Sequence, residues 1–255
     1  MTELIVGRRL LRVGRVDSTM EEVAALARAG EPEGVVVIAD EQRAGRGRMG
    51  RSWRAPAGTA VLCSILLRPL VLASALPLLS LVAGVAVAEA IEDVTGLSPR
   101  LKWPNDVWLG TEGRKVAGLL ATARVEQRPS VVLGIGINVT GNTARLPPEA
   151  TSLEHELGRA VDREAVLHHL LIRLDARYRT FLALSGAVGL DDWQRRAALI
   201  GELIDIESGG ERRSGRFVGV GDDGALLLET DSGTIESIMA GEVVRGPRLV
   251  VQTVP

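Results

Sequence analysis

The segment Gly45–Arg51 contains three arginines and three glycines around a single methionine, and Trp53 follows it. Glycine can adopt positive φ and lets a backbone approach a ligand closely. Each guanidinium adds a permanent charge and a planar set of donors that matches the oxygens of a phosphate or a carboxylate. The segment therefore predicts an anion-binding loop, with the indole of Trp53 available to cover a flat ring. A solvated basic surface loop is the alternative that such a run leaves open.

The glycines of this loop follow neither of two common nucleotide-binding patterns. The sequence contains no G-x-x-x-x-G-K-[ST] motif, and the segment does not read as a tight turn between a strand and a helix. We therefore expect a phosphate site that is neither a P-loop nor a Rossmann site.

Three further short motifs combine lysine, asparagine or glycine with apolar runs. In Lys102–Asp106 (Lys-Trp-Pro-Asn-Asp), a proline fixes the backbone beside a lysine and two short polar side chains. Lys115 begins an apolar run, which places its ammonium group at the rim of a core. Gly134 and Gly136 interrupt a branched apolar run that reaches Asn138, as expected where a ligand or another backbone approaches closely. Each motif alone is also compatible with an ordinary turn or strand.

The elements that must position these motifs are short apolar strands and a few helices. Ser18 with Glu21 fits a capping box ahead of a predicted helix that ends before Gly30. A second helix, buried in the core, is predicted to begin near Pro77. Strands are predicted at residues 9–16, 34–39, 60–67, 100–103, 115–125 and 130–139. Strands this dense among few helices favour an α+β fold with a mixed β-sheet over a regular βαβ repeat.

Beyond residue 160 the pattern changes twice. Residues 162–184 carry apolar side chains at helical spacing, and residues 190–199 add a shorter helix. From Gly201 onward, turns rich in Gly, Asp and Ser separate short apolar runs at residues 203–206, 216–220, 225–228 and 234–238. These runs predict a small β-barrel. We therefore expect two domains, residues 1–199 and residues 200–255.

The composition limits the classes of function. With 255 residues, of which 46% are hydrophobic, the chain can bury a full core. Its formal net charge of −2 argues against a general nucleic-acid binder. The single cysteine, Cys63, lies in an apolar run, which predicts a buried, unreactive thiol and a reducing, cytosolic setting. The histidines form no spaced set of metal ligands, so we expect no metal site built by the protein alone.

One segment raises the question of a membrane span. Residues 69–88 carry no charge, and about 20 such residues can cross a bilayer. Pro77 and several small residues within the segment favour a buried core helix instead. The N-terminus lacks the apolar core and the cleavage site of a signal peptide. We therefore expect a cytoplasmic protein with no membrane partner.

Together, these motifs resemble the biotin-protein ligase family, also called biotin-[acetyl-CoA-carboxylase] ligases. The resemblance implies a class II synthetase-like catalytic domain, which is a mixed β-sheet with packed helices, followed by a small SH3-like β-barrel that ends near Ala240–Val243. Met20 departs from the pattern, because many members of the family carry a polar residue after the Ser-Thr pair. The matching motifs, in family order across Asp17–Val139, are Ser18-Thr19, Glu41–Arg48, Lys102–Asp106, Lys115–Gly118 and Gly134–Asn138.

The resemblance implies a two-step, ATP-dependent reaction. The carboxylate of biotin attacks the α-phosphate of ATP and forms biotinyl-5′-AMP and pyrophosphate, and a lysine of a biotin carboxyl carrier protein then attacks the acyl-adenylate. Two anions meet in the first step, so fixed cations would reduce their repulsion and stabilise the developing charge. Mg²⁺ is expected to arrive with ATP and to be held mainly by phosphate oxygens, with Asp106 as a contributing ligand.

The resemblance also assigns roles to individual residues. Lys115, Arg48 and Arg51 are the implied catalytic residues, and we assign Lys115 an electrostatic role because the attacking amine comes from the carrier. Trp53 is expected to cover the adenine. The implied biotin-binding residues are Ser18, Thr19, Gln42, Arg46, Gly47, Arg48, Lys115 and Gly118. The implied ATP-binding residues are Arg48, Arg51, Trp53, Lys102, Asn105, Lys115 and Asn138.

Several alternatives stay open at this point. A lipoate or octanoate ligase of the same superfamily also acylates a carrier lysine. A non-catalytic biotin or nucleotide sensor would keep a polar pocket but would not need Lys115. A biotin-responsive repressor would need an N-terminal helix-turn-helix, and the residues before Asp17 leave no room for one. A homodimer is left open, with no interface assigned.

Overall fold

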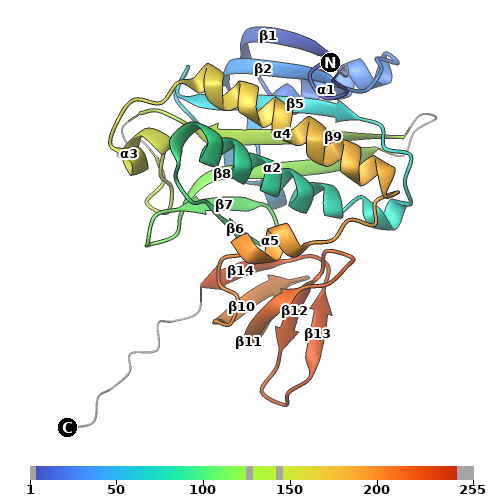
Figure 1. Ribbon diagram of the computed structural model, residues 1–255, viewed down its shortest axis with the longest axis vertical. Helices are drawn as coiled ribbons and strands as arrows, with labels where there is room; N and C mark the ends of the chain where they lie inside the picture. The colour runs from blue at the N-terminus through green and yellow to red at the C-terminus, as the bar shows by residue number, and fades with distance from the viewer. Residues whose placement is uncertain (1–3, 125–128, 142–145, 246–255) are drawn as a thin grey trace. The chain divides into compact units, whose positions relative to one another are not determined.

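The computed structural model describes residues 4–124, 129–141 and 146–245. Contacts divide the chain into two compact units, Met1–Ala198 and Leu199–Pro255. Figure 1 gives the course of the chain through both.

A mixed β-sheet forms the centre of the first unit. Within the described residues it has seven strands in the order β1-β2-β5-β9-β8-β7-β6, of which β1 and β2 are parallel and the other neighbours antiparallel. The central strands β5 and β9 are mostly apolar and are buried along their whole length, as strands covered on both faces must be. The strands are β1 (Arg9–Val16), β2 (Val35–Gln42), β5 (Ala60–Leu67), β6 (Arg100–Lys102), β7 (Asp106–Leu109), β8 (Arg114–Arg124) and β9 (Ser130–Asn138).

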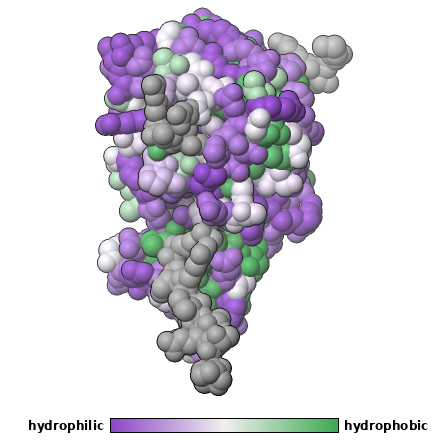
Figure 2. All heavy atoms as spheres, turned by 90° about the vertical axis from the view of Figure 1, so that its left-hand side faces the viewer, coloured by the Kyte–Doolittle hydropathy of each residue, from purple (hydrophilic) through white to green (hydrophobic). Residues whose placement is uncertain are grey.

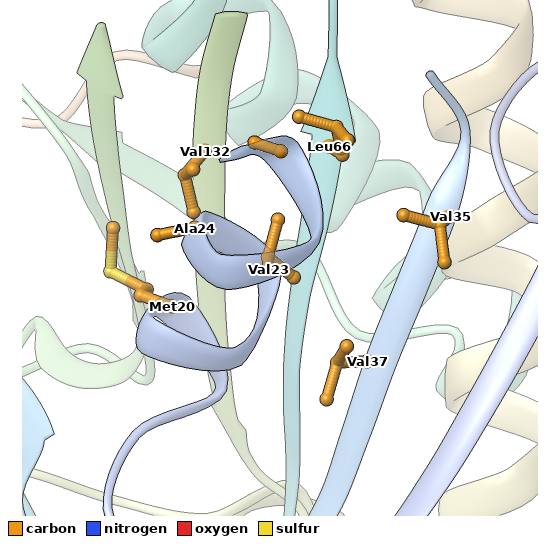
Figure 3. Packing of buried hydrophobic residues seen from close by; sticks show 8 residues of the cluster. Met20, Val23, Ala24, Val35, Val37, Leu66 and Val132 are labelled. Atoms are coloured by element: carbon orange, nitrogen blue, oxygen red, sulfur yellow. The ribbon is translucent and has the colours of Figure 1, made fainter. Parts of the chain in front are cut away.

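Two long helices cover one face of this sheet. Helices α2 (Leu78–Thr95) and α4 (Arg163–Ala183) pack against each other and lie side by side in front of the sheet in Figure 1. Helix α1 (Thr19–Arg28) packs on the opposite face. There Met20, Val23 and Ala24 contact the valines and leucine of three neighbouring strands, as Figure 3 shows. The mixed sheet with packed helices confirms the predicted α+β fold class.

The first part of helix α2 lies in the uncharged segment, residues 69–88, that was identified from the sequence. Pro77 is its N-cap residue and Gly96, in the left-handed region, ends it. Among the described residues, one helical stretch, Ala73–Thr95, is long and apolar enough to cross a membrane by length and composition. Most of it is buried inside the protein, which confirms the prediction of a buried core helix. On the face shown in Figure 2, hydrophilic residues cover most of the larger unit.

The beginning of α1 differs from the prediction. Ser18 occupies the N-cap position with an extended backbone, but its side chain makes no capping hydrogen bond. Glu21 does not reach back to Ser18 and instead forms an ion pair with Arg46. The predicted capping box is therefore wrong, because a cation from the neighbouring loop attracts the carboxylate away from the helix terminus. The remaining elements of this unit are β3 (Gly45–Arg46), η1 (Arg48–Gly50), β4 (Ser52–Trp53), η2 (Ala73–Ala75), α3 (Leu153–Leu157) and α5 (Asp191–Arg196).

In the second unit, residues 199–245 form a five-stranded antiparallel sheet in the order β13-β12-β11-β10-β14. The side chain of Phe217 is fully buried and lies among the apolar residues of its core. The two-residue loop Gly209-Gly210 joins β10 to β11, and both glycines have positive φ, which such tight hairpins require. The strands are β10 (Leu203–Ser208), β11 (Glu211–Val220), β12 (Leu226–Glu229), β13 (Ile235–Ile238) and β14 (Glu242–Arg245).

Candidate active site

The arginine-glycine segment folds as a small hairpin. Strands β3 and β4 pair through Gly45 with Trp53 and Arg46 with Ser52. A Cβ atom on Gly45 would lie 2.5 Å from the carbonyl oxygen of Trp53, so this close pairing requires glycine. The turn between them is closed by a hydrogen bond of 2.7 Å from the amide of Gly47 to the carbonyl of Arg51. The hairpin therefore brings Trp53 back beside the start of the loop.

The indole of Trp53 lies on two glycines of the central sheet. Gly118 on β8 and Gly136 on β9 are cross-strand partners, and side chains there would collide with the ring. A Cβ atom on Gly136 would lie 2.4 Å from Cε2 of Trp53, and one on Gly118 would lie 3.0 Å from Cζ3. The indole nitrogen is buried and has no hydrogen-bond partner among the residues that the structure describes. We call Gly118 and Gly136 the glycine platform, a flat surface on which an aromatic ring can lie.

Lys115 lies at the edge of the glycine platform. Its ammonium nitrogen is 2.7 Å from Oδ1 of Asp106 and 5.6 Å from the centroid of the Trp53 ring. In a regular strand, residues three apart point to opposite faces. The pairing of β7 with β8 shifts register between Val107 and Trp108, and the irregularity turns Lys115 to the face of Gly118. This bulge therefore aims the cation at the platform.

Arg48 approaches the same place from the hairpin. Its Nη1 lies 3.5 Å from Oδ1 of Asn105, whose own Nδ2 donates to the carbonyl of Leu119 at 2.6 Å. Burial lowers the pKa of the Arg48 guanidinium, while the Asp106 carboxylate raises this pKa and Arg51 lowers it further. A partly buried cation beside another cation is electrostatically strained. An anion bound there would relieve that strain.

A second polar cluster lies at the start of α1. Oε1 of Gln42 accepts hydrogen bonds from the backbone amide of Thr19 at 2.8 Å and from its hydroxyl at 3.0 Å. The Thr19 hydroxyl is also 2.7 Å from the hydroxyl of Ser64 on β5. The hydroxyl of Ser18 is buried and has no partner among the described groups. Ser64 was missed from the sequence, because it lies within an unbroken apolar run and no local signal distinguishes it.

Comparison with known proteins places this chain in a family. Residues 13–139 match the Biotin/lipoate A/B protein ligase family, and residues 199–246 match the Biotin protein ligase C terminal domain. The chain is 36% identical to the biotin--[acetyl-CoA-carboxylase] ligase of Mycobacterium tuberculosis over 243 residues, which cover 93% of this chain and 89% of that one. The chain belongs to the biotin/lipoate A/B protein ligase family. The family resemblance of the sequence motifs is therefore confirmed.

Further members and solved structures agree. The bifunctional ligase/repressor BirA of Bacillus subtilis is 35% identical over 248 residues, which cover 95% of this chain and 75% of BirA. The structure of the biotin protein ligase from Aquifex aeolicus in complex with biotin and ATP matches with a TM-score of 0.80 and 32% identity. That match covers 93% of this chain and 98% of the Aquifex chain. The second unit is accordingly an SH3-like antiparallel sheet.

The structure of this family member brings together most, but not all, of the predicted site residues. Thr19 and Gln42 meet in one polar cluster beside Ser18, and Arg48, Asn105 and Lys115 converge around Asp106. The other predicted side chains have different partners. Arg46 pairs with Glu21 and is mostly exposed. Lys102 holds its ammonium nitrogen 5.1 Å from the centroid of the Trp108 ring.

Asn138 also has a structural partner. Its Nδ2 donates to the carbonyl of Thr151 at 3.0 Å, and its side chain is buried. Trp108 and Thr151 were not predicted from the sequence. Trp108 lies beside predicted residues because its strand pairs with neighbouring strands, and Thr151 does so because a later part of the chain folds back against the sheet. Local sequence patterns do not encode such contacts.

Cys63 is buried, as predicted from its apolar run. Burial raises the pKa of the Cys63 thiol to about 12, so the thiol stays protonated and unreactive at neutral pH. His169 on α4 pairs with Asp93 on α2, with Nδ1 3.1 Å from the carboxylate. Within residues 4–124, 129–141 and 146–245, no group of three His, Cys, Asp or Glu side chains is arranged to hold a metal ion.

Proposed function

We propose that this chain is an ATP-dependent biotin protein ligase. It activates biotin as biotinyl-5′-AMP and transfers the biotinyl group to a specific lysine of a biotin carboxyl carrier protein, a subunit of acetyl-CoA carboxylase or a related carboxylase. The observation that carries the proposal is the convergence of Lys115 and Arg48 with Asn105 and Asp106 beside the glycine platform. The likeness to a ligase structure in complex with biotin and ATP supports it.

The first step joins two anions, and the cations of the site lower its barrier. A carboxylate oxygen of biotin attacks the α-phosphorus of ATP, and pyrophosphate leaves with its electron pair. Lys115 and Arg48 face the oxygens on which negative charge develops, and Arg51 adds charge at the hairpin. Because Lys115 is already paired with Asp106, its ammonium group is held in place before the ligands arrive.

The second step needs an amine from the carrier and no nucleophile from this chain. The carrier lysine attacks the acyl carbon of biotinyl-5′-AMP, an amide forms, and AMP leaves. Lys115 stabilises the oxyanion of this step without forming a covalent bond. Cys63 is buried and protonated, so it does not compete for the acyl group.

We assign the biotin ring to the polar cluster at the start of α1. Ser18, Thr19 and Gln42 supply hydroxyl and amide groups for a ureido ring, and the unpartnered Ser18 hydroxyl has a donor and an acceptor available. Arg46, Gly47, Arg48, Lys115 and Gly118 complete the predicted biotin site. Arg46 would leave Glu21 to do so, at small cost because exposed ion pairs contribute little.

We assign the nucleotide to the side of Lys115 that lies away from the polar cluster of Thr19 and Gln42. Trp53 covers the adenine, and Arg48, Arg51, Lys102, Asn105, Lys115 and Asn138 surround the rest of the nucleotide. The carboxylate of Asp106 and the amide of Asn105 fit a Mg²⁺ ion that takes most of its ligands from phosphate oxygens and water. Such an ion would supply positive charge that offsets the negative charge of the phosphates.

Biotin is favoured over lipoate or octanoate by the second unit. The family matched by residues 13–139 includes both kinds of ligase, whereas residues 199–246 match a biotin protein ligase domain specifically. We propose residues 1–199 as the catalytic domain and residues 200–255 as the SH3-like domain, in a cytoplasmic enzyme. A homodimer stays an expectation that light scattering during gel filtration would measure.

The function is tested by incubating the purified protein with biotin, ATP, Mg²⁺ and a biotin carboxyl carrier domain, and by weighing the carrier. We expect a mass increase of one biotinyl group that disappears when the acceptor lysine is replaced. Replacing biotin with lipoate should give no increase. Biotin binding without any transfer to the carrier would instead support a sensor.

The Lys115→Ala variant separates a ligase from a sensor. Removing a fixed cation from the reacting oxygens should lower the rate of adenylate formation by about 100-fold or more, with a smaller effect on biotin binding. Biotin-dependent pyrophosphate exchange measures the rate, and calorimetry measures binding. Arg159→Ala, on the surface, is the control. An unchanged exchange rate in Lys115→Ala would contradict the assigned role.

A further inference from the structure

The backbone of Lys115 is held by a segment far along the chain. Its amide donates to the carbonyl of Glu149 at 2.8 Å, and its carbonyl accepts from the amide of Thr151 at 2.9 Å. Residue 150 thereby forms a parallel bridge with Lys115, on the side opposite to Trp108 of β7. The position of the Lys115 backbone therefore depends on where residues 149–151 lie.

Glu156 fixes that segment to the strand that carries Lys115. Its Oε1 accepts a hydrogen bond from the Thr151 hydroxyl at 2.6 Å and another from Nη2 of Arg114 at 2.8 Å. Arg114 directly precedes Lys115 on β8, so one carboxylate joins both partners of the bridge. Ser152 caps α3 and so places Glu156 in the first turns of that helix, facing β8.

The surroundings of Glu156 leave it little freedom. Its side chain is only 12% exposed, and Thr151 is fully buried. A Cβ atom on Gly110 would lie 2.7 Å from Oε2 of Glu156, so the turn between β7 and β8 also confines the carboxylate. Charge-assisted hydrogen bonds are stronger and shorter than neutral ones, especially when shielded from water. The carboxylate is therefore a fixed point for both strands.

We propose that Glu156 is a positioning residue for biotin activation, acting through Thr151 and Arg114 on the backbone of Lys115. This inference rests on the proposed ligase function and on the role of Lys115 in it. Glu156 touches neither reacting group in this arrangement. It keeps the Lys115 ammonium group beside Asp106 and the glycine platform, where a shift of about 1 Å can cost on the order of 100-fold in rate.

The test compares four variants of the full chain. Glu156→Ala removes the carboxylate, and Thr151→Val removes only the hydroxyl that donates to it while keeping the buried volume. Thr151→Ser restores the hydroxyl. Glu112→Gln is the matched control, because Glu112 is the other carboxylate near Arg114, at 3.8 Å, but its side chain is 75% exposed. Biotin-dependent pyrophosphate exchange, calorimetric biotin affinity and thermal unfolding are measured for each.

We expect Glu156→Ala and Thr151→Val to lower kcat for exchange by roughly 10- to 100-fold. KM for biotin should stay within about twofold of the unmodified protein, because the polar cluster of Thr19 and Gln42 is untouched. Thr151→Ser and Glu112→Gln should keep near-normal kcat. The split between kcat and KM separates loss of positioning from loss of the binding site.

Two results would overturn the proposal. One is a normal kcat in Thr151→Val or in Glu156→Ala. The other is a fall in kcat that Thr151→Ser does not reverse, or a fall in kcat together with an equal loss of biotin affinity. Either of these would indicate general damage to the protein. If Glu156→Ala does not fold, the comparison of Thr151→Val with Thr151→Ser decides. An unmodified protein without any biotin-dependent exchange would reject the ligase function itself, a result distinct from these.

Discussion

At the scale of single residues, the site depends as much on absent side chains as on charged ones. Lys115 and Arg48 bring positive charge, but the surface beside them is flat only because Gly118 and Gly136 carry no Cβ atom. Met20 illustrates the opposite case. It departs from the polar residue of the family pattern, and its thioether is buried in the core between α1 and the sheet, against Gly134. Its apolar side chain therefore stabilises α1 on the sheet.

The glycine platform makes a residue-scale prediction. In Gly136→Ala, the new methyl group would lie 2.4 Å from the Trp53 ring, so the indole must move. An aromatic contact contributes about 1 kcal/mol, so KM for ATP should rise by about fivefold. Steady-state kinetics of pyrophosphate exchange measures the change. Gly14→Ala on β1 is the control, because a Cβ atom there meets nothing within 4 Å. An equal rise in KM for ATP in both variants would contradict the assignment of Trp53 to the nucleotide.

At the scale of elements, irregularities in regular structure position the reactive groups. The bulge between β7 and β8 turns Lys115 to the face of Gly118, and the β3–β4 hairpin returns Trp53 to the platform. Helices α2 and α4, on the face of the sheet opposite to α1, are joined by ion pairs as well as by apolar contacts. Asp93 of α2 binds Arg173 and His169 of α4, and these hydrogen bonds lower the pKa of Asp93 to about 2.

The depressed pKa of Asp93 predicts how its contribution to stability depends on pH. A carboxylate whose folded pKa lies below the unfolded value of about 4 stabilises the folded state above that pH. Its contribution falls as the pH drops from about 4 towards 2. Urea unfolding of Asp93→Asn should therefore show a deficit at pH 7 that shrinks with acid. Because Asp93, Arg173 and His169 are partly exposed, salt should also reduce the loss of stability in Asp93→Asn. A loss of stability that does not depend on pH would contradict this account.

At the scale of the whole chain, each of the two units has its own hydrophobic core. The first surrounds the central sheet with α1 on one face and α2 and α4 on the other. The second has Phe217 fully buried among residues of its own antiparallel strands. The same division appears in the family comparison, where separate matches cover residues 13–139 and residues 199–246.

The separate cores predict separable stability. Phe217→Ala should destabilise the second unit by about 3–5 kcal/mol, the usual cost of truncating a buried phenylalanine. Biotin should still raise the unfolding temperature of the first unit, because the proposed biotin residues all lie there. Differential scanning calorimetry with and without biotin measures both effects. Leu203→Ala, at an exposed position on β10, is the control. If biotin no longer raised the unfolding temperature of the first unit in Phe217→Ala, the two units would not have separate stabilities.

Much of this protein follows from the sequence because the signals are local. A continuous apolar run predicted the buried strand β5, and a segment rich in branched apolar residues predicted β9. Pro77 with the uncharged segment before and after it predicted the start of α2. The motifs with glycine, lysine and asparagine predicted the family. Strands β7 and β14 were missed, and it is pairing that makes them strands: β7 pairs with β6 and β8, and β14 pairs with β10.

Only the tertiary structure decided how the predicted residues combine. The amino-acid types at 48, 105, 106 and 115 set their charge and hydrogen-bonding capacity, but a bulge and a hairpin bring them within contact of one another. Ser64, Trp108, Thr151 and Glu156 entered the site or its support without any local signal. Their roles arise from contacts between segments far apart in the chain, and such contacts depend on how the strands pair and how later segments return to them.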